Sequence, residues 1–494
     1  MNSVYGDTRD AAAMSLGRRM VGDTPRRLKL LTAALAVLAL LLGLVYALAL
    51  GSDSSSFTGL QARTSEVSAT GDLYYQLNDM DAQAANALLV GFHPADPATV
   101  PSSVNATAST SLYQQDRSAA DADLAQIARN PQLTARTEKL IDDLGAYEAL
   151  IADAMYVDQN TANQQPATPP AAALSAYAEA SSLLHATLLP AALQIADADS
   201  SAVDTSYSGE HSTAVDYGYA ILVLALLAGV GLCAGNRFHA RRFRRRISWL
   251  AGGVVISLAL GLLGLTTQLG AADDLHDAKK NAYDSINALT RARAVSDDAN
   301  ADESRWLLEG RTAALQSSFF QKADSIAGVP GISSGDAGED PHAYYAGLSA
   351  AVDGLRVDAS SDSVSGVKLS GYLGTELDNI TFPGEAQAAY DATGAFNTYL
   401  QDDAVIRADA GRGDLAAAVA FDIGTEPGQS NFAFNQYMSK LGTVVKVNDV
   451  GFAAGIAAGQ GESGAAPWTT MITGELFLLL FIAQAGAARL REYH

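Results

Sequence analysis

The chain has 494 residues, with 54 Asp and Glu against 32 Lys and Arg, and its net charge of −22 argues against a nucleic-acid binder, which needs a basic surface. The single cysteine excludes a disulfide framework and cysteine-based metal sites. Apolar residues make up 48% of the chain and gather in four long runs, which predicts an integral membrane protein.

Each apolar run is long enough to cross a bilayer as a helix, because about 20 residues rising ~1.5 Å each span the ~30 Å hydrocarbon layer. The predicted transmembrane helices are 30–50, 217–235, 247–268 and 469–488. The first run exceeds the ~7–15 apolar residues of a signal peptide, so we expect an uncleaved anchor. Near the end of the second run, Gly231 and Gly235 would let another helix approach closely, either within the chain or in a homodimer.

Basic residues indicate the orientation, because cytoplasmic segments of membrane proteins carry an excess of Lys and Arg. The N-terminal segment 1–29, the turn 236–246 and the tail 489–494 are basic, whereas 51–216 and 269–468 are strongly acidic. We therefore expect a multi-pass protein of the cell membrane, with both termini in the cytoplasm and two acidic domains outside. The turn would contact anionic lipid headgroups through Arg237, Arg241, Arg242, Arg244, Arg245 and Arg246.

Proline placement and hydrophobic periodicity predict helices in the two acidic domains. No proline occurs from 26 to 93 or from 191 to 329, so the helices of the first three membrane runs should continue beyond the bilayer. Apolar residues recur at helical spacing, as in 133–155. We predict an all-α integral membrane protein with four transmembrane helices and two extracytoplasmic antiparallel bundles of about four helices each. The segment 326–383 is less regular and has room for a short hairpin.

A weak internal repeat favours a duplicated plan in which a span, a bundle and a span occur twice. Residues 79–91 align with 298–310 at five identities, each 219 residues apart, and the pairs include Asp79 with Asp298 and Gly91 with Gly310. Both motifs lie at a similar distance from the preceding membrane run. Chance similarity in an alanine-rich chain is the alternative.

No known catalytic motif occurs in a convincing context. Phosphate-binding loops, metalloprotease motifs and dinucleotide fingerprints are absent from the sequence. The stretch from Gly331 through Ser333 to Gly335 matches a hydrolase motif, but no apolar strand precedes it, so we interpret it as a flexible loop. His185 is read as a packed or surface residue and Cys233 as a small packing residue. We expect no enzyme activity, no cofactor and no metal.

Glu475 is unusual because it lies inside the fourth membrane run, roughly 10 Å beyond the interfacial Trp468. A carboxylate at that depth needs a proton or a partner. Thr266, Thr267 and Gln268 end the third run on the same side and could donate to it. An interhelical hydrogen bond and a proton-linked signalling group both remain open.

The expected layout favours a signal relay. The three cytoplasmic segments are too short for a kinase or a nucleotide-binding domain, and membrane runs with few polar residues give a poor transport path. Helices that pass through the bilayer into outer bundles can shift when a ligand or a partner binds outside. In this layout the outer domains resemble the ligand-binding helical bundles of bacterial chemoreceptors.

The chain also resembles the GlnX family of actinobacterial membrane proteins. The resemblance covers the layout and is carried locally by 79–91, by 298–310 and by the tail Arg489–Tyr493. It implies two partners, an extracytoplasmic solute-binding lipoprotein of the GlnH type, which binds amino acids, and a cytoplasmic serine/threonine kinase of the PknG type. It further implies a role in sensing aspartate, glutamate or related amino acids, and it assigns no ligand residues.

Two alternative functions remain open at this point. A direct, chemoreceptor-like sensor of an anionic small molecule would need an arginine in a bundle groove, such as Arg63, Arg136, Arg305 or Arg407. An envelope scaffold would have no signalling role. In each case we expect membrane lipids as partners and no nucleic acid.

Overall fold

The computed structural model describes residues 24–96, 105–129, 133–243 and 247–490, and almost all of them are helical. The first helices are α2 (Thr24–Val90), α3 (Ala106–Ile127), α4 (Thr134–Gln159), α5 (Ala171–Leu183) and α6 (Leu189–Phe243). They are followed by α7 (Ser248–His276), α8 (Asp284–Leu308), α9 (Ala313–Ile326), α10 (Ser334–Glu339) and α11 (Pro341–Asp353). The last are α12 (Gly371–Asp378), α13 (Glu385–Gly411), α14 (Leu415–Asp422), α15 (Ser430–Glu462) and α16 (Ala465–Leu490).

The chain forms two compact units, each assembled from separate stretches of sequence. The first unit comprises the described parts of 1–59, 206–276 and 455–494. The second unit comprises the described parts of 60–205 and 277–454, which we call its first and second halves. Three helices, α2, α6 and α15, contribute residues to both units.

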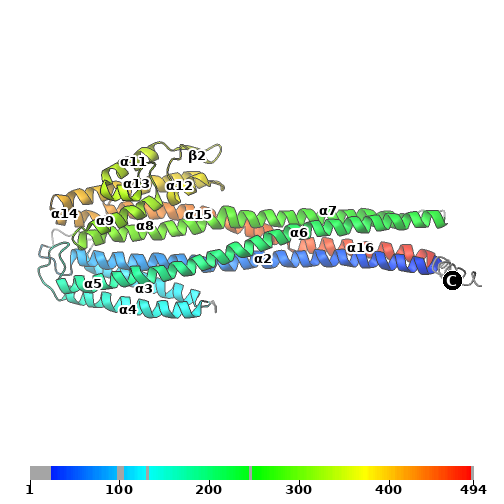
Figure 1. Cartoon of the computed structure of the whole chain (residues 1–494), viewed down its shortest axis with the longest axis horizontal. Coiled ribbons are helices and arrows are strands. Elements are labelled where there is room, and N and C mark those ends of the chain that lie inside the picture. Colours follow the sequence, from blue (N-terminus) through cyan, green and yellow to red (C-terminus); the bar gives the residue numbers. More distant parts are fainter. Residues whose placement is uncertain (1–23, 97–104, 130–132, 244–246, 491–494) are drawn as a thin grey trace, which may run out of the picture. The chain divides into compact units, whose positions relative to one another are not determined.

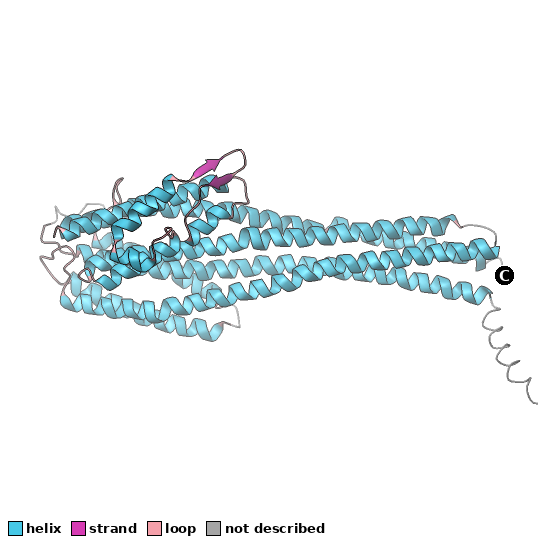
Figure 2. Ribbon diagram, turned by 45° about the horizontal axis from the view of Figure 1, so that its top comes forward, coloured by secondary structure: helices cyan, strands magenta, loops and turns pink. Residues whose placement is uncertain are grey.

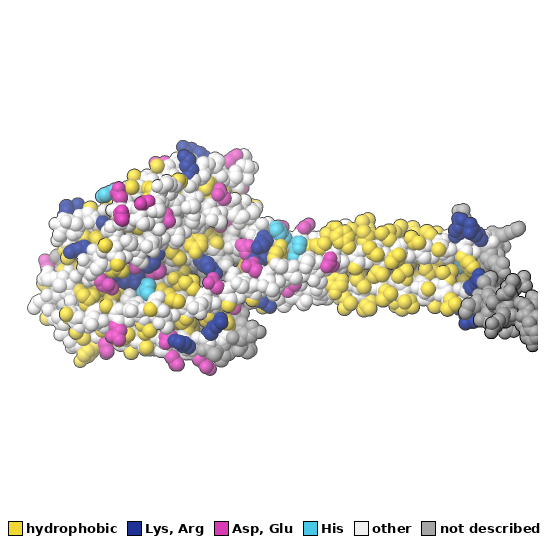
Figure 3. All heavy atoms as spheres, viewed as in Figure 1, with side chains coloured by type: hydrophobic (Ala, Val, Ile, Leu, Met, Phe, Trp, Pro, Cys, Tyr) yellow, Lys and Arg dark blue, Asp and Glu magenta, His cyan; other side chains and the backbone are white. Residues whose placement is uncertain are grey.

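The first unit is a bundle built from four helices that are long and apolar enough to cross a membrane. Its core is formed by residues such as Leu42, Ala225 and Leu478. Its outer surface is also apolar, since Val230 and Val255 are 67% and 68% exposed (Figure 3). A bundle that is hydrophobic inside and outside suits lipid as its solvent. The four predicted helices of membrane-spanning length and hydropathy are confirmed and support a multi-pass membrane protein, and its orientation stays a prediction.

Small residues allow the helices of the first unit to approach closely. A β-carbon at Gly261 would overlap Ala225, and the hydroxyl of Ser257 donates to the carbonyl of Ala225 at 2.7 Å. Gly231 and Gly235 both face Leu35 of α2, so this pair packs against a helix of the same chain.

Local chemistry explains where the long helices are interrupted. A π-helical turn, η2 (Leu184–Leu188), joins α5 to α6 just before Pro190. Proline cannot donate a backbone hydrogen bond and crowds the preceding turn, and a π turn accommodates both effects. Similarly, two residues separate the end of α15 from the start of α16, whose first turn contains Pro467. A second π turn, η3 (Asp277–Tyr283), joins α7 to α8.

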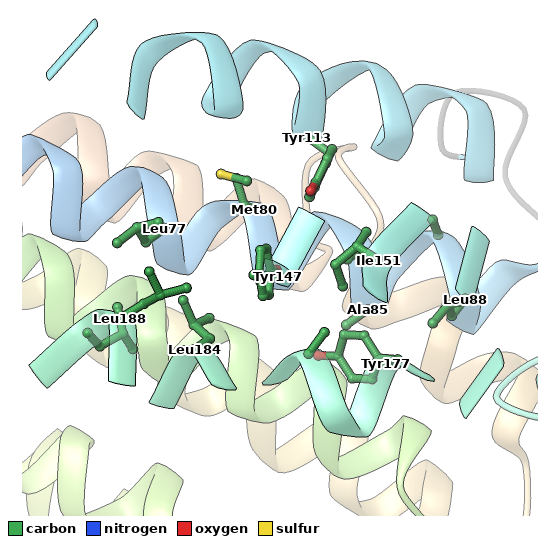
Figure 4. Packing of buried hydrophobic residues seen from close by; sticks show 14 of the residues in the cluster. Leu77, Met80, Ala85, Leu88, Tyr113, Tyr147, Ile151, Tyr177, Leu184 and Leu188 are labelled. Atoms are coloured by element: carbon green, nitrogen blue, oxygen red, sulfur yellow. The ribbon is translucent and has the colours of Figure 1, made fainter. Parts of the chain in front are cut away.

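One hydrophobic core of the second unit contains residues of both halves, and another lies entirely within the second half. In the first half, α3, α4 and α5 lie along the C-terminal part of α2 (Figure 1), and Figure 4 shows Leu77, Met80, Tyr147 and Tyr177 packed together. The same core includes Trp306 of α8 and residues of α13 and α14, which belong to the second half. The sequence predicts two separate bundles, but in the structure apolar residues of the first half are buried against apolar residues of the second half.

The irregular segment of the second half contains the short hairpin expected from the sequence (Figure 2). Strands β1 (Arg356–Asp358) and β2 (Ser363–Ser365) are antiparallel, with Val357 opposite Val364. This half contains more helices than the four expected, because α10, α11, α12 and α14 are short additions.

Candidate functional site

The repeat motifs detected in the sequence are the C-terminal turns of α2 and α8. Gly91 directly follows α2, and Gly310 lies two residues beyond the end of α8. Their φ angles are +75° and +78°. The left-handed conformation terminates a helix, and glycine adopts it without steric cost. The shared glycines therefore stop two long helices at equivalent places.

Upstream of these glycines, the motifs bury polar and charged side chains. In α2, Asp81 and Asn86 are 0% and 2% exposed. In α8, Asp298, Asp302 and Arg305 are 6%, 1% and 3% exposed. Burial of an unpaired charge is very costly, so these groups have to be paired within the fold.

Arg305 joins the two motifs. Its guanidinium donates from Nη2 to Asp302 and to Oδ1 of Asp298, the latter at 3.2 Å. Nη1 donates to the hydroxyl of Ser181 at 3.1 Å and lies 3.6 Å from Oδ2 of Asp81. Burial alone would lower the pKa of Arg305, but the neighbouring aspartates raise it above its usual value, so the charge is retained.

Lys322 of α9 and His185 of η2 complete this group, which we call the Arg305 network. The ammonium of Lys322 lies 2.6 Å from Asp298 and 2.5 Å from Asp302. Burial alone would raise the pKa of Asp298, but Lys322, His185 and Arg305 hold it well below its usual value.

His185 can adopt two hydrogen-bonding states within the network. Its Nδ1 lies 2.7 Å from the carbonyl oxygen of Ser181 and can donate to it. In a neutral ring with that tautomer, Nε2 accepts from Nη1 of Arg305 at 2.7 Å. In the other neutral tautomer, Nε2 donates to Asp298 at 3.2 Å and Nδ1 accepts from Nη1 of Arg305 at 3.0 Å. The tautomer therefore decides whether the ring bonds to Asp298.

Asp81 is held by hydroxyl groups from the first half. Tyr177 and Tyr147 donate to it at 3.2 and 3.4 Å, and Ser181 donates at 3.5 Å. Burial raises the pKa of both tyrosines well above the usual value, so both remain donors. Figure 4 shows the two rings entering from α4 and α5 beside α2.

A second buried group, the Arg407 network, lies in the second half. Nε of Arg407 pairs with Oδ2 of Asp403 at 2.8 Å, and the guanidinium stacks 4.6 Å from the ring of Trp306. Burial raises the pKa of Glu303 well above its usual value and that of Asp422 to about 7, so protons are retained in this acidic group. Ser304 donates to Asn86 at 2.8 Å and to Asp422 at 3.2 Å, which links this network to α2.

These networks are suited to holding helices in register. Their charged groups are paired mainly with one another, although Glu303, Asp403 and Arg407 each keep one buried polar atom without a hydrogen-bond partner among the described residues. No group of three His, Cys, Asp or Glu residues in the described part of the chain could hold a metal ion. Buried charges that pair at only one helix register can specify that register. The geometry thus points to a conformational role.

Four arginines considered as ligand contacts fall into two groups. Arg305 and Arg407 are paired with aspartates in the two networks, and Nη2 of Arg407 is buried without a hydrogen-bond partner among the described residues. Arg63 and Arg136 are exposed on the surface of the second unit. The candidates from the sequence therefore lie in buried ion pairs or on the open surface. Arg117, which sequence reasoning missed, lines a groove that we describe below; its helical spacing with Tyr113 could have indicated a shared face.

Glu475 lies in the core of the first unit and is 9% exposed. Its carboxylate oxygens have no hydrogen-bond partner among the described residues, and they face Gly43 of α2. The expected donors bond elsewhere, since Gln268 donates to Asp53 at 2.5 Å and Thr266 to its own helix at 3.1 Å. The expected interhelical hydrogen bond is therefore not formed by these residues.

The remaining sequence candidates are placed as follows. Arg237 and Arg241 lie in the last turns of α6, and the side chain of Arg242 is outside the described residues, as are Arg244, Arg245 and Arg246. Cys233 was expected to pack inside, but it is exposed because it is one residue, or ~100°, away from the buried Leu232. Ser333 is the N-cap of α10 with Asp336, so the expected loop is a helix start.

Comparison with known proteins gives one match. Residues 57–208 match a protein-family model described as an actinobacterial sensor domain. The matched stretch begins inside α2, ends inside α6 and includes α3, α4, α5 and η2. No curated protein matches the chain, and no solved structure matches it. The match supports an actinobacterial sensor protein with a sensing role.

Proposed function

We propose that this protein relays a signal across the membrane, coupling an extracytoplasmic amino-acid-binding lipoprotein to a cytoplasmic serine/threonine kinase. The sensor-domain match supports a sensing role, and the four membrane-length helices support a place in the bilayer. The lipoprotein and the kinase are proposed from the resemblance to the GlnX family. No catalytic activity is assigned to the chain.

One observation carries the relay. The sensor match begins in α2 and ends in α6, and each of these unbroken helices also contributes residues to the membrane-spanning first unit. A continuous helix is stiff, so a shift or rotation imposed on the matched domain would move the membrane segment of the same helix. α15 provides a third such connection from the second half.

The Arg305 network gives this relay a two-state element. Its ion pairs join α8 and α9 to α2 and η2, and the tautomer of His185 decides whether the ring bonds to Asp298. A signal that moved one of these helices would exchange one set of partners for another. Such discrete exchanges are how small displacements become switches.

The orientation follows the charge distribution, with the termini and the turn 236–246 in the cytoplasm. Impermeant maleimide labelling of single cysteines in a Cys233→Ser background tests it. Asp153→Cys, in the exposed part of α4, should label in intact cells, and Arg237→Cys should label only after the membrane is opened. The reverse pattern would contradict the orientation.

The relay is tested by the kinase response to external amino acids in cells. Replacing Arg237 and Arg241 by Gln should abolish the response without loss of the protein from the membrane, because the kinase would contact the basic turn. Arg63→Gln and Arg136→Gln are the matched controls, since both arginines are exposed elsewhere. An unchanged response in a deletion strain would refute the relay and favour the envelope scaffold.

A further inference from the structure

A groove of about 430 Å³ lies between α3 and α4, inside the segment that matches the sensor domain. It is lined by the small, exposed residues Gly145, Ala149 and Ala152 and by the buried apolar side chains of Ile151 and Met155. Small residues on α4 leave room beside the helix backbone. The volume suits a small molecule with a short aliphatic portion.

The groove also presents two opposite charges side by side. Nε of Arg117 pairs with Oε1 of Glu148 at 3.0 Å, and Nη1 donates to Gln114 at 3.1 Å. The side chains of Arg117 and Glu148 are 42% and 26% exposed, so their mutual attraction is worth only about 0–1 kcal/mol. A ligand with both charges could therefore insert between them at little cost.

A third polar group in the groove lacks a partner. Tyr113 is 5% exposed, and its hydroxyl is buried without a hydrogen-bond partner among the described residues. A buried hydroxyl is normally hydrogen-bonded, so the Tyr113 hydroxyl is available to a water molecule or to a ligand atom that reaches it. Burial raises the pKa of Tyr113, as do the charges of Glu148 and Asp81. The hydroxyl of Tyr113 therefore interacts electrostatically with Glu148 of the groove and with Asp81, which pairs with Arg305.

We propose that this groove directly binds an aliphatic zwitterion of amino-acid size. The carboxylate would bind to Arg117 and to the hydroxyl of Tyr113, the ammonium to Glu148, and the aliphatic part would contact Ile151 and Met155. A simple anion would be repelled by Glu148 and a simple amine by Arg117, so the pair selects a molecule carrying both charges. The proposal rests on the sensing function proposed above, and it requires no binding lipoprotein.

Isothermal titration calorimetry on the full chain in lipid nanodiscs tests this site. The probes are L-leucine, 4-methylpentanoate, which lacks the ammonium, and 3-methylbutylamine, which lacks the carboxylate. L-leucine should bind, and each truncated analogue should bind at least about tenfold more weakly. L-aspartate should also bind more weakly, because its second carboxylate would be placed near Glu148.

Variants assign the binding to the groove. Arg117→Gln and Glu148→Gln should each weaken L-leucine binding at least about tenfold, and Tyr113→Phe should weaken it by roughly two- to tenfold. Arg136→Gln and Glu138→Gln are matched controls on exposed positions of α4 and should leave the dissociation constant unchanged. Tyr113→Phe preserves the ring, so its effect reports the hydroxyl and not the packing.

The proposal is overturned if L-leucine does not bind at about 10 mM, if either analogue or L-aspartate binds as tightly, or if the control variants weaken binding equally. These outcomes are separate from a failure of the relay. Absence of binding together with an intact kinase response would refute only the groove. Binding of L-leucine without any kinase response would refute the relay and leave the groove in place.

Discussion

Replacement of Arg305 by Met tests whether the Arg305 network holds the second unit together. Met has a similar length and can fill the space, but it carries no charge. The side chain of Arg305 is 4% exposed, and three carboxylates lie within 3.6 Å of its guanidinium. The free-energy cost of removing these carboxylates from water is offset mainly by Arg305 and by Lys322.

The expected cost follows from the charges that remain. Without Arg305, Lys322 would still pair with Asp298 and Asp302, whereas the buried Asp81 would lose the cation that pairs with it. Removing one partner of a buried ion pair typically costs about 3–5 kcal/mol. Arg305→Met should therefore lower the free energy of unfolding of the second unit by that amount. Adding Asp81→Asn should recover about 1–2 kcal/mol, because it removes one of the uncompensated charges.

The assay uses the fluorescence of Trp306, which lies in α8 next to the network. The chain has three tryptophans, and replacing Trp249 and Trp468 by Phe would leave Trp306 as the only one. Urea titration of the purified protein in detergent then reports the unfolding of the second unit. If the dependence of the unfolding free energy on urea concentration is the same in both proteins, the unfolding transition is unchanged. Arg291→Met is the control on the same helix. Its pair with Asp197 is partly exposed, so it should cost only about 0–1 kcal/mol.

If Arg305→Met costs less than about 1 kcal/mol, or no more than Arg291→Met, then the buried pairs do not stabilise the unit as argued here. If Asp81→Asn fails to relieve the loss in the double variant, the coupling of the two repeat motifs through Arg305 is wrong.

Three further predictions concern other buried groups. Burial and the nearby Glu385 raise the pKa of Glu376 to about 8. The contribution of the protonated Glu376 to stability is therefore complete below the unfolded pKa and is lost as the pH rises through about 8. Glu376→Gln should flatten the fall in the urea midpoint of the second unit between about pH 5 and pH 9. Glu475→Leu should raise the stability of the first unit in detergent by about 1–3 kcal/mol, measured through Trp468, because it removes buried polar atoms that have no hydrogen-bond partner among the described residues; a loss of stability would indicate a missed partner. Gly459→Ala should cost about 1–3 kcal/mol, since its β-carbon would overlap the ring of Phe57, and Phe57→Leu should restore much of the loss if that overlap is the cause.

Hydropathy and helical spacing were sufficient to predict much of the fold. The four membrane-length helices, the long helix from the first membrane run and the short hairpin in 326–383 follow from local sequence, because chain length, proline and side-chain periodicity act within a few residues. The repeat of 79–91 in 298–310 also predicted equivalent elements, and both motifs end long helices at a left-handed glycine.

The partners of the polar residues could not be predicted in the same way. The sequence marked Glu475 as a group that needs a partner, but it could not show that Gln268 bonds to Asp53. It offered Arg305 as one of four candidate ligand contacts for a direct sensor, whereas the structure places it among three aspartates. An arginine in a solvated groove and one in a buried ion pair look alike in sequence, because burial depends on which helices pack around it.

The sequence by itself thus determined that the chain is helical, that four stretches suit a bilayer and that two related motifs recur. Only the tertiary structure decided that both halves of the second unit share a core, that Asp81 and Arg305 lie 3.6 Å apart, and that Arg117 and Glu148 meet in one groove. The physical reason is the range of the interactions. Helix formation and lipid solubility are set by neighbouring residues, whereas an ion pair between residues more than 200 positions apart exists only once the helices have packed.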